Sequence, residues 1–206
     1  MTGTTLVIET ATAACSVALL AGGERLASLH EVVGRGHAER LVPMIGEVLR
    51  DAGLAKADAL LVDCGPGSFT GIRVGLAAAR ALGFAWRLPV QGYSALALIA
   101  AAAHEGDMVG VAITGGHGEL FVQRFARAPL APLDAMRSLL PEAAAEAIPE
   151  AHVLGSGAAA LVAARGWGTA DARLPDALDA RLLPAALASL PPSPLYGRPP
   201  DAALPR

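Results

Sequence analysis

The chain has 206 residues and a formal net charge of -3, and 53% of its residues are apolar although only 4% are aromatic. This length suffices for one large domain or two small lobes with a buried core. The slightly acidic balance argues against an autonomous nucleic-acid-binding protein. No apolar run reaches membrane-spanning length, and the first residues lack the basic region of a signal peptide. Cys15 and Cys64 have no CxxC spacing, so we expect buried thiols in a cytoplasmic protein.

The first half of the chain predicts three consecutive strands and then alternating helices and strands. The predicted strands cover residues 6–8, 15–20, 25–30, 59–63 and 90–93, and the predicted helices cover 37–52, a segment reaching 86, and 94–104. Apolar residues at helical spacing and Gly53 just after the last of them define the first of these helices. The resulting β-β-β-α-β-α-β-α order is typical of a ribonuclease H-like layout, with helices packed against a mixed sheet.

The second half repeats this pattern in weaker form. A strand at 108–113, a polar turn at 114–118 and a returning strand at 119–126 precede Ala-rich helical sequence, and a strand at 151–154 leads into a glycine turn and another helix. We therefore predict an α/β protein of two ribonuclease H-like lobes, as in actin-like (ASKHA) ATPases, with mixed sheets flanked by helices and a degraded second lobe. The predicted boundaries are 1–104 and 105–206. The Pro-rich C-terminal tail is expected to be extended on the surface or flexible.

The most specific motif is the run GPGSFTGIRVG at residues 65–75, between a predicted strand and a predicted helix. It lacks the Gly-Lys-Ser/Thr ending of a Walker loop and the third glycine of a dinucleotide-binding turn. Small residues continue at every fourth position as Gly71, Gly75, Ala79 and Gly83, so one face of the helix carries almost no side chains. Such a ridge fits either a tight helix-packing surface or a turn that faces a ligand.

Catalytic chemistry within this chain has few candidates. Glu9 and Asp63 follow predicted strands, where carboxylates of actin-like ATPases hold magnesium near phosphates. The five histidines show no HxxH or HxxxH spacing, so no metal site is predicted. Ser68 lies outside a G-x-S-x-G elbow and is a better helix cap than nucleophile. An ATPase or a peptidase-like metalloprotein active on its own remains the alternative to a non-catalytic protein.

Three arginines lie one heptad apart along the glycine-containing helix, Arg73, Arg80 and Arg87. Two interpretations are open: a solvated helix edge, or a basic strip that helps a partner complex to contact RNA phosphates.

Several segments resemble the bacterial TsaB family, the dimerisation subunit of the machinery that makes N6-threonylcarbamoyladenosine next to the anticodon of tRNA. The matching segments are residues 6–19, 36–45 and GPGSFTGIRVG at 65–75, with weaker matches at 118–121, 155–157 and 194–198. The similarity is dense through the first hundred residues and thin beyond them. Glu9 replaces the aspartate usual in the family, and Thr114 and Gly116 stand where it commonly has Asp and Arg, so no second-lobe site is carried over.

The resemblance implies an actin-like two-lobed subunit that is not an enzyme on its own. Its partners would be a TsaD-type catalytic paralogue, in a heterodimer, and a TsaE-type ATPase, with tRNA contacted only through the complex. ATP and metal would belong to the partner subunits, and this chain would need no cofactor. Helices of the first lobe would pack across the interface; whether isolated chains pair with themselves through it stays open. The expected partner-binding residues are His37, Leu41, Met44, Ile45, Gly71, Val74, Gly75, Ala78, Ala79 and Leu82.

Overall fold

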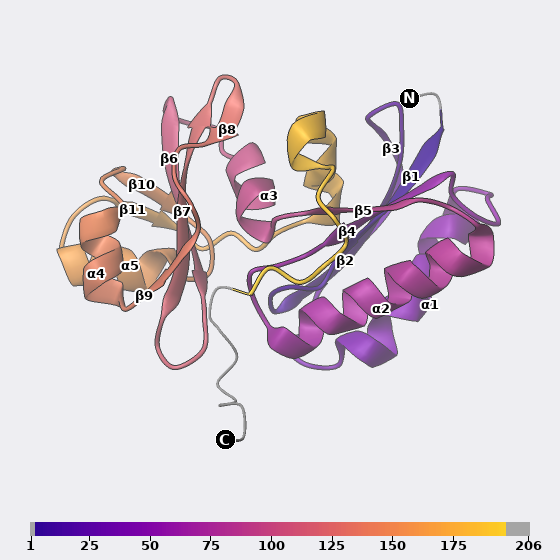
Figure 1. Ribbon diagram of the computed structural model, residues 1–206, viewed down its shortest axis with the longest axis horizontal. Helices are drawn as coiled ribbons and strands as arrows, with labels where there is room; N and C mark the ends of the chain where they lie inside the picture. Colours follow the sequence, from indigo (N-terminus) through magenta and orange to yellow (C-terminus); the bar gives the residue numbers. More distant parts are fainter. Residues whose placement is uncertain (1–2, 197–206) are drawn as a thin grey trace, which may run out of the picture.

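The computed structural model describes residues 3–196 and consists of two lobes, each built on a mixed β-sheet (Figure 1). The elements of the first lobe are β1 (Thr4–Glu9), β2 (Ala14–Ala21), β3 (Glu24–Val32), α1 (His37–Asp51), β4 (Ala59–Asp63), α2 (Phe69–Trp86), β5 (Val90–Tyr93) and α3 (Ala95–Ala101). The sheet order is β3-β2-β1-β4-β5; β2 is antiparallel to both of its neighbours, and β1, β4 and β5 are parallel. This topology confirms the ribonuclease H-like layout predicted for the first half.

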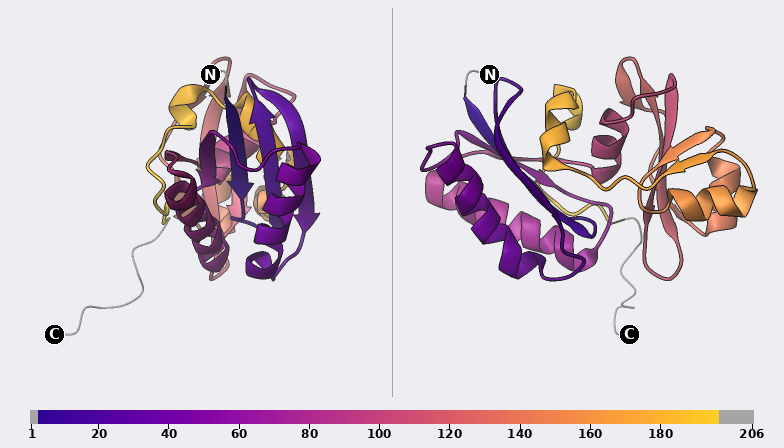
Figure 2. Two further views of the ribbon diagram at one scale, coloured as in Figure 1. Left: turned by 90° about the vertical axis from the view of Figure 1, so that its right-hand side faces the viewer. Right: turned by 180° about the vertical axis from the view of Figure 1, so that it is seen from behind.

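Both faces of the first sheet are covered, which follows from the alternation of side chains along its strands. On β1, Leu6 and Ile8 belong to the core that includes apolar residues of α1 and α2. Val7 points to the other face and packs in a cluster with α3 and the C-terminal segment. Helices α1 and α2 therefore lie side by side on the outside of the lobe, away from the second lobe (Figures 1 and 2).

The second lobe contains a smaller and more irregular sheet. Its elements are β6 (Met108–Thr114), β7 (Leu120–Arg127), β8 (Leu130–Pro132), β9 (Arg137–Leu139), α4 (Pro141–Ala147), β10 (His152–Leu154), α5 (Ala158–Arg165) and β11 (Thr169–Asp171). The order is β11-β10-β6-β7-β8, and β9 also pairs with β7. The hairpin of β6 and β7 confirms the predicted strand-turn-strand. The Ala-rich stretch after it forms two short strands before any helix, because Pro129 and Pro132 cannot supply helical N–H donors.

After β11 the chain returns to the first lobe. Two short 3-10 helices, η1 (Ala177–Leu182) and η2 (Ala185–Leu187), lie between the lobes (Figure 1). Ala177 and Ala180 are buried against Val7, Leu61 and Tyr93 of the first sheet. The boundary expected at residue 104 thus divides the two sheets, but the segment from η1 onward packs with the first lobe. It covers an apolar sheet face that would otherwise be exposed to water.

No helix among residues 3–196 is long and apolar enough to cross a membrane.

Candidate functional site

The glycine-rich turn between β4 and α2 packs directly on the turn between β1 and β2. The Ser68 N–H donates to the Ala11 carbonyl at 2.6 Å, and the Thr10 hydroxyl donates to the Gly71 carbonyl at 2.8 Å. Ser68 also caps α2, because its side chain accepts a hydrogen bond from the Gly71 N–H, as predicted. At Gly67, where φ is 157°, a Cβ would lie 2.1 Å from the Ala11 carbonyl oxygen. Only glycine permits these two turns to approach so closely.

The ridge of small residues on α2 faces the protein's own sheet. A Cβ at Gly71 would lie 2.1 Å from the Thr10 carbonyl oxygen, and one at Gly75 would lie 2.4 Å from the Thr10 hydroxyl oxygen. Ala79 is fully buried, and a Cβ at Gly83 would lie 2.5 Å from a methyl group of Val90 on β5. The ridge therefore serves close packing within the chain. This corrects the expectation that Gly71, Gly75 and Ala79 face a partner.

The expected partner-binding residues of α1 are also turned inward. Leu41, Met44 and Ile45 are at most 5% exposed and belong to the core beneath the helix. His37 is 8% exposed, and its Nε2 lies 3.1 Å from the carbonyl oxygen of Ala14. These four residues hold α1 on the sheet, so they are not available to a partner. Their helical spacing was interpreted correctly as one face of a helix, but that face is the buried one.

Outside the buried faces of the two helices lie further apolar side chains, some exposed and some half-buried, and we call these residues the outer helix face. It consists of Val42 on α1 and of Val74, Ala78, Leu82 and Phe84 on α2. Phe84 is 89% exposed and Val42 is 65% exposed. Val74, Ala78 and Leu82 are half-buried at the margin of the core, and their assignment to a partner surface stays a prediction.

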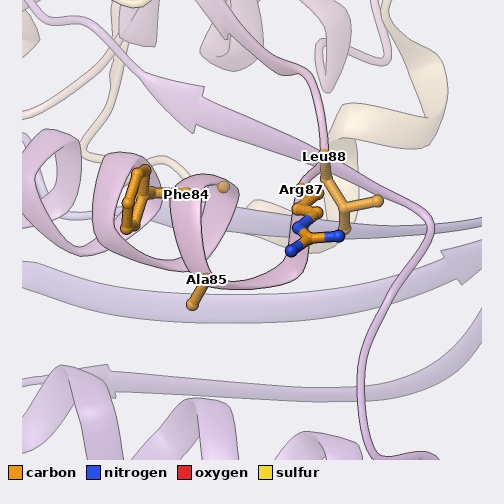
Figure 3. Close-up of a pocket in the computed structure, with 5 residues that line it drawn as sticks. Phe84, Ala85, Arg87 and Leu88 are labelled. Carbon is orange, nitrogen blue, oxygen red and sulfur yellow. The ribbon is translucent and has the colours of Figure 1, made fainter.

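A shallow pocket lies at the C-terminal end of α2, next to the outer helix face. Gly83, Phe84, Ala85, Arg87 and Leu88 line it. Figure 3 shows Phe84 on the last turn of α2 and Arg87 at the residue that caps the end of this helix. Arg87 adopts a left-handed conformation, with φ 58°, and its N–H bonds back to the helix. The pocket thus adjoins the most exposed aromatic side chain of the outer helix face.

The predicted basic strip on α2 is largely engaged by the C-terminal segment. The Arg73 guanidinium lies 3.6 Å from the centre of the Phe69 ring and donates to the Tyr196 hydroxyl at 3.3 Å. Arg80 donates to the carbonyl of Pro192 at 2.5 Å. Two of the three arginines therefore bind the chain itself, and the interpretation of the strip as a contact to RNA phosphates stays a prediction.

Two carboxylates and a tyrosine meet at the ends of three parallel strands. Glu9, Asp63 and Tyr93 end β1, β4 and β5, and all three are fully buried. Glu9 accepts a hydrogen bond from the Ala11 N–H at 2.8 Å, and Asp63 accepts one from the Gly65 N–H at 2.9 Å. The second carboxylate oxygen of Asp63 is buried and has no hydrogen-bond partner among the described residues.

Burial makes the neutral forms of both carboxyl groups more favourable. It raises the pKa of Glu9 from 4.5 to about 7, and the charge of Asp176 adds to this effect. Burial, followed by the charge of Glu9, raises the pKa of Asp63 well above its ordinary value. The Tyr93 hydroxyl lies 3.0 Å from both the Ile8 carbonyl and the Glu9 carboxyl. A protonated Glu9 satisfies both contacts, since it donates to the hydroxyl while the hydroxyl donates to Ile8.

The turn between β1 and β2 is buried and internally bonded. The turn from Glu9 to Thr12 is at most 8% exposed, and the glycine-rich turn occupies the Ala11 carbonyl. Phosphate binding at a strand-turn junction requires backbone N–H groups that point to solvent, whereas the Ala11 N–H is bonded to Glu9. Among residues 3–196, no group of three or more His, Cys, Asp or Glu residues could hold a metal ion. The chemistry that the geometry supports here is proton sharing within a buried network.

Two features of the site were not predicted from the sequence. Phe69 and Phe84 are exposed aromatic residues on α2, in a chain with only four phenylalanines. The sequence did contain a signal for their exposure, because neither position belongs to the series of small residues that forms the ridge. The packing of Tyr196 against Phe69, with ring centres 5.9 Å apart, depends on a contact between distant segments that no local pattern indicates.

Fold and site together define a two-lobed protein with the actin-like arrangement of mixed sheets, in which the turn next to the strand-end carboxylates is closed and the outer helices are exposed. A protein-family profile described as "TsaD: tRNA N6-adenosine threonylcarbamoyltransferase" matches residues 29–147. The solved structure described as "YeaZ from Pseudomonas aeruginosa" superposes with a TM-score of 0.80 at 32% identity, over 94% of this chain and 99% of that chain.

Two curated relatives carry the name tRNA threonylcarbamoyladenosine biosynthesis protein TsaB. The protein from Haemophilus influenzae is 42% identical over 129 residues, and the one from Escherichia coli is 38% identical over 127 residues. These alignments cover 60% and 59% of this chain and 54% of each relative. The chain thus spans about half the length of the curated relatives it matches. It belongs to the TsaB family.

Proposed function

We propose that this chain is a subunit of the complex that makes N6-threonylcarbamoyladenosine in tRNA, and that it acts there as a non-catalytic dimerisation subunit. The names of the two TsaB relatives point to this pathway. The observation that carries the structural role is the outer helix face, where Val42 and Phe84 are exposed on neighbouring helices. Large apolar side chains exposed on the helices of one lobe are a feature of many protein interfaces.

The proposed partner is a TsaD-type catalytic paralogue that recognises the outer helix face. A profile of that enzyme family matches more than half of this chain, so the two proteins would share an architecture. Related subunits commonly pair through equivalent surfaces, and the helices α1 and α2 offer such a surface. Pairing would activate the paralogue, and the paralogue would supply the metal site. A TsaE-type ATPase would join the pair and bind ATP, and tRNA would be contacted through the complex alone.

The experiment is a binding and reconstitution test with the full chain. Size-exclusion chromatography with light scattering measures the mass of the chain alone, of the TsaD-type paralogue alone and of their mixture. We expect a heterodimer in the mixture, and modified nucleoside in tRNA only when ATP, the TsaE-type ATPase and both paralogues are present. If the isolated chain forms a homodimer, added paralogue should replace one of its two copies, because the homodimer and the heterodimer would use the same outer helix face.

Two results would contradict the proposal. One is synthesis of the modified nucleoside by this chain without the paralogue. The other is ATP turnover by the isolated chain that is lost in a Glu9→Ala variant, which would favour an actin-like ATPase. Metal analysis of the purified chain tests the metalloprotein alternative in the same preparation.

A further inference from the structure

The chain segment Leu190–Tyr196, which we call the strap, runs along the open edge of the first sheet. Leu190 and Gly92 exchange backbone hydrogen bonds of 2.7 and 2.9 Å, which place the strap antiparallel to β5, the edge strand. Further on, the Leu195 N–H donates to the Cys64 carbonyl at 2.7 Å. The strap therefore covers both the sheet edge and the start of the glycine-rich turn that leads into α2 (Figure 1).

The strap also holds α2 along its side. Arg80, in the middle of the helix, donates to the Pro192 carbonyl at 2.5 Å. In the first turn, the Arg73 guanidinium lies over the Phe69 ring and donates to the Tyr196 hydroxyl, and the Tyr196 ring lies tilted against the Phe69 ring. These contacts lie on the flank of α2, next to the outer helix face and on the side away from α1.

The buried face of α2 is poor in side chains, so the flanking contacts add to the packing that holds the helix. Ile72 and Leu76 are the large side chains on that face, and Gly71, Gly75 and Gly83 contribute none. A glycine ridge permits close approach but supplies little interlocking of side chains to fix the helix along its axis. The strap bonds to two points on α2 and to the turn before it, so it restricts the movement that the ridge leaves free.

We propose that docking of the strap is coupled to partner binding: the docked strap fixes α2 in the position in which the outer helix face binds the TsaD-type paralogue. The coupling rests on the proposed function. Its physical basis is linkage, since a partner that binds the strap-docked state more tightly must also stabilise the docked strap by the same factor. The strap is suited to reversible docking because Pro191, Ser193 and Tyr196 are exposed and its bonds are few.

The test combines strap-anchor variants with two independent measurements. Arg80→Ala combined with Tyr196→Ala removes both side-chain anchors, and Arg25→Ala on β3 is the control for loss of an exposed arginine. Hydrogen exchange at the amides of Leu190 and Leu195 reports strap docking, and calorimetric titration with the paralogue reports affinity. We expect faster exchange and an affinity about tenfold lower in the anchor variant, with neither change in the control.

The wild-type chain supplies a second arm that needs no variant. Saturation with the paralogue should slow exchange at the amides of Leu190 and Leu195, although both lie outside the outer helix face. The proposal is overturned if the paralogue does not alter the exchange rate at these amides in the wild type. It is also overturned if the anchor variant exchanges at the wild-type rate, or if it exchanges faster but binds the paralogue as tightly as wild type does. Failure of the wild-type chain to bind the paralogue at all would instead refute the proposed function, and the coupling with it.

Discussion

The protonation of Glu9 gives the sharpest test of the buried network. Glu9 is fully buried between the Ala11 N–H and the Tyr93 hydroxyl, and burial raises its pKa from 4.5 to about 7. Since the folded-state pKa lies above the unfolded-state value, the stability linked to this group is fully present below pH 4.5 and is lost as the pH rises to about 7. At about 1.4 kcal/mol for each pKa unit, the full loss amounts to about 3.5 kcal/mol.

The perturbation is Glu9→Gln, which keeps the shape and removes the ionisation. Urea unfolding of the wild type and of the variant between pH 5 and pH 8 gives the free energy of unfolding of each. We expect the variant to gain on the wild type by about 2.5 kcal/mol over this range. Glu9 ionises only in the wild type, whereas the buried Asp63 is present in both proteins. Glu24→Gln, at an exposed position on β3, is the control and should show no such trend. A difference between variant and wild type that does not change with pH would refute the reasoning.

Three further outcomes follow from the packing of α2. Gly71→Ala should lower the free energy of unfolding by about 3 kcal/mol in urea titrations, since its Cβ meets the backbone oxygen of Thr10; an unchanged midpoint would show that the two segments separate at no cost. Ser68→Ala should cost about 1 kcal/mol by loss of the helix cap, with recovery in Ser68→Asp. Phe84→Glu should weaken titrated binding of the paralogue about 30-fold at unchanged melting temperature, whereas Leu133→Glu, in the second lobe, should bind as wild type.

The topology of the first lobe could be predicted because each element carries its own local signal. Short apolar runs marked the strands, and the predicted segment 15–20 lies within β2. Helical spacing and Gly53 marked α1, and Gly53 does adopt a left-handed conformation after its end. The turn residues at 65–68 were equally informative, since Ser68 caps α2 as expected. These signals act over a few residues and need no knowledge of the partner elements.

The direction of the ridge could not be predicted, because small residues serve a contact within a chain and a contact between chains equally well. The deciding residue is Thr10, whose carbonyl and hydroxyl oxygens occupy the space beside Gly71 and Gly75. Thr10 is 61 residues away from Gly71 along the chain. The same limit explains the buried residues of α1: helical spacing shows that one face is apolar, and only the folded chain shows what covers that face.

The C-terminal segment was predicted to be extended on the surface or flexible, and its described part, up to Tyr196, is extended along the first lobe. Residues 197–200 of the predicted tail lie outside the described part of the chain. Prolines indicated the extended backbone. The prolines did not indicate where the segment binds. At Leu190, Pro192 and Leu195 the strap binds through main-chain groups, and main-chain groups are the same in almost every residue type.

Closure of the first turn and exposure of the outer helices have a common structural origin. In open α/β sheets, ligands bind in the crevice outside the carboxyl ends of the parallel strands. Here, glycines at 67, 71 and 75 bring α2 and its turn against Thr10 and Ala11, which closes that opening. On its other sides, α2 carries Val74 and Ala78, which pack partly against the core, and Phe84, which is 89% exposed. The proposed partner surface therefore lies on the side of α2 away from the closed turn, where Phe84 is exposed.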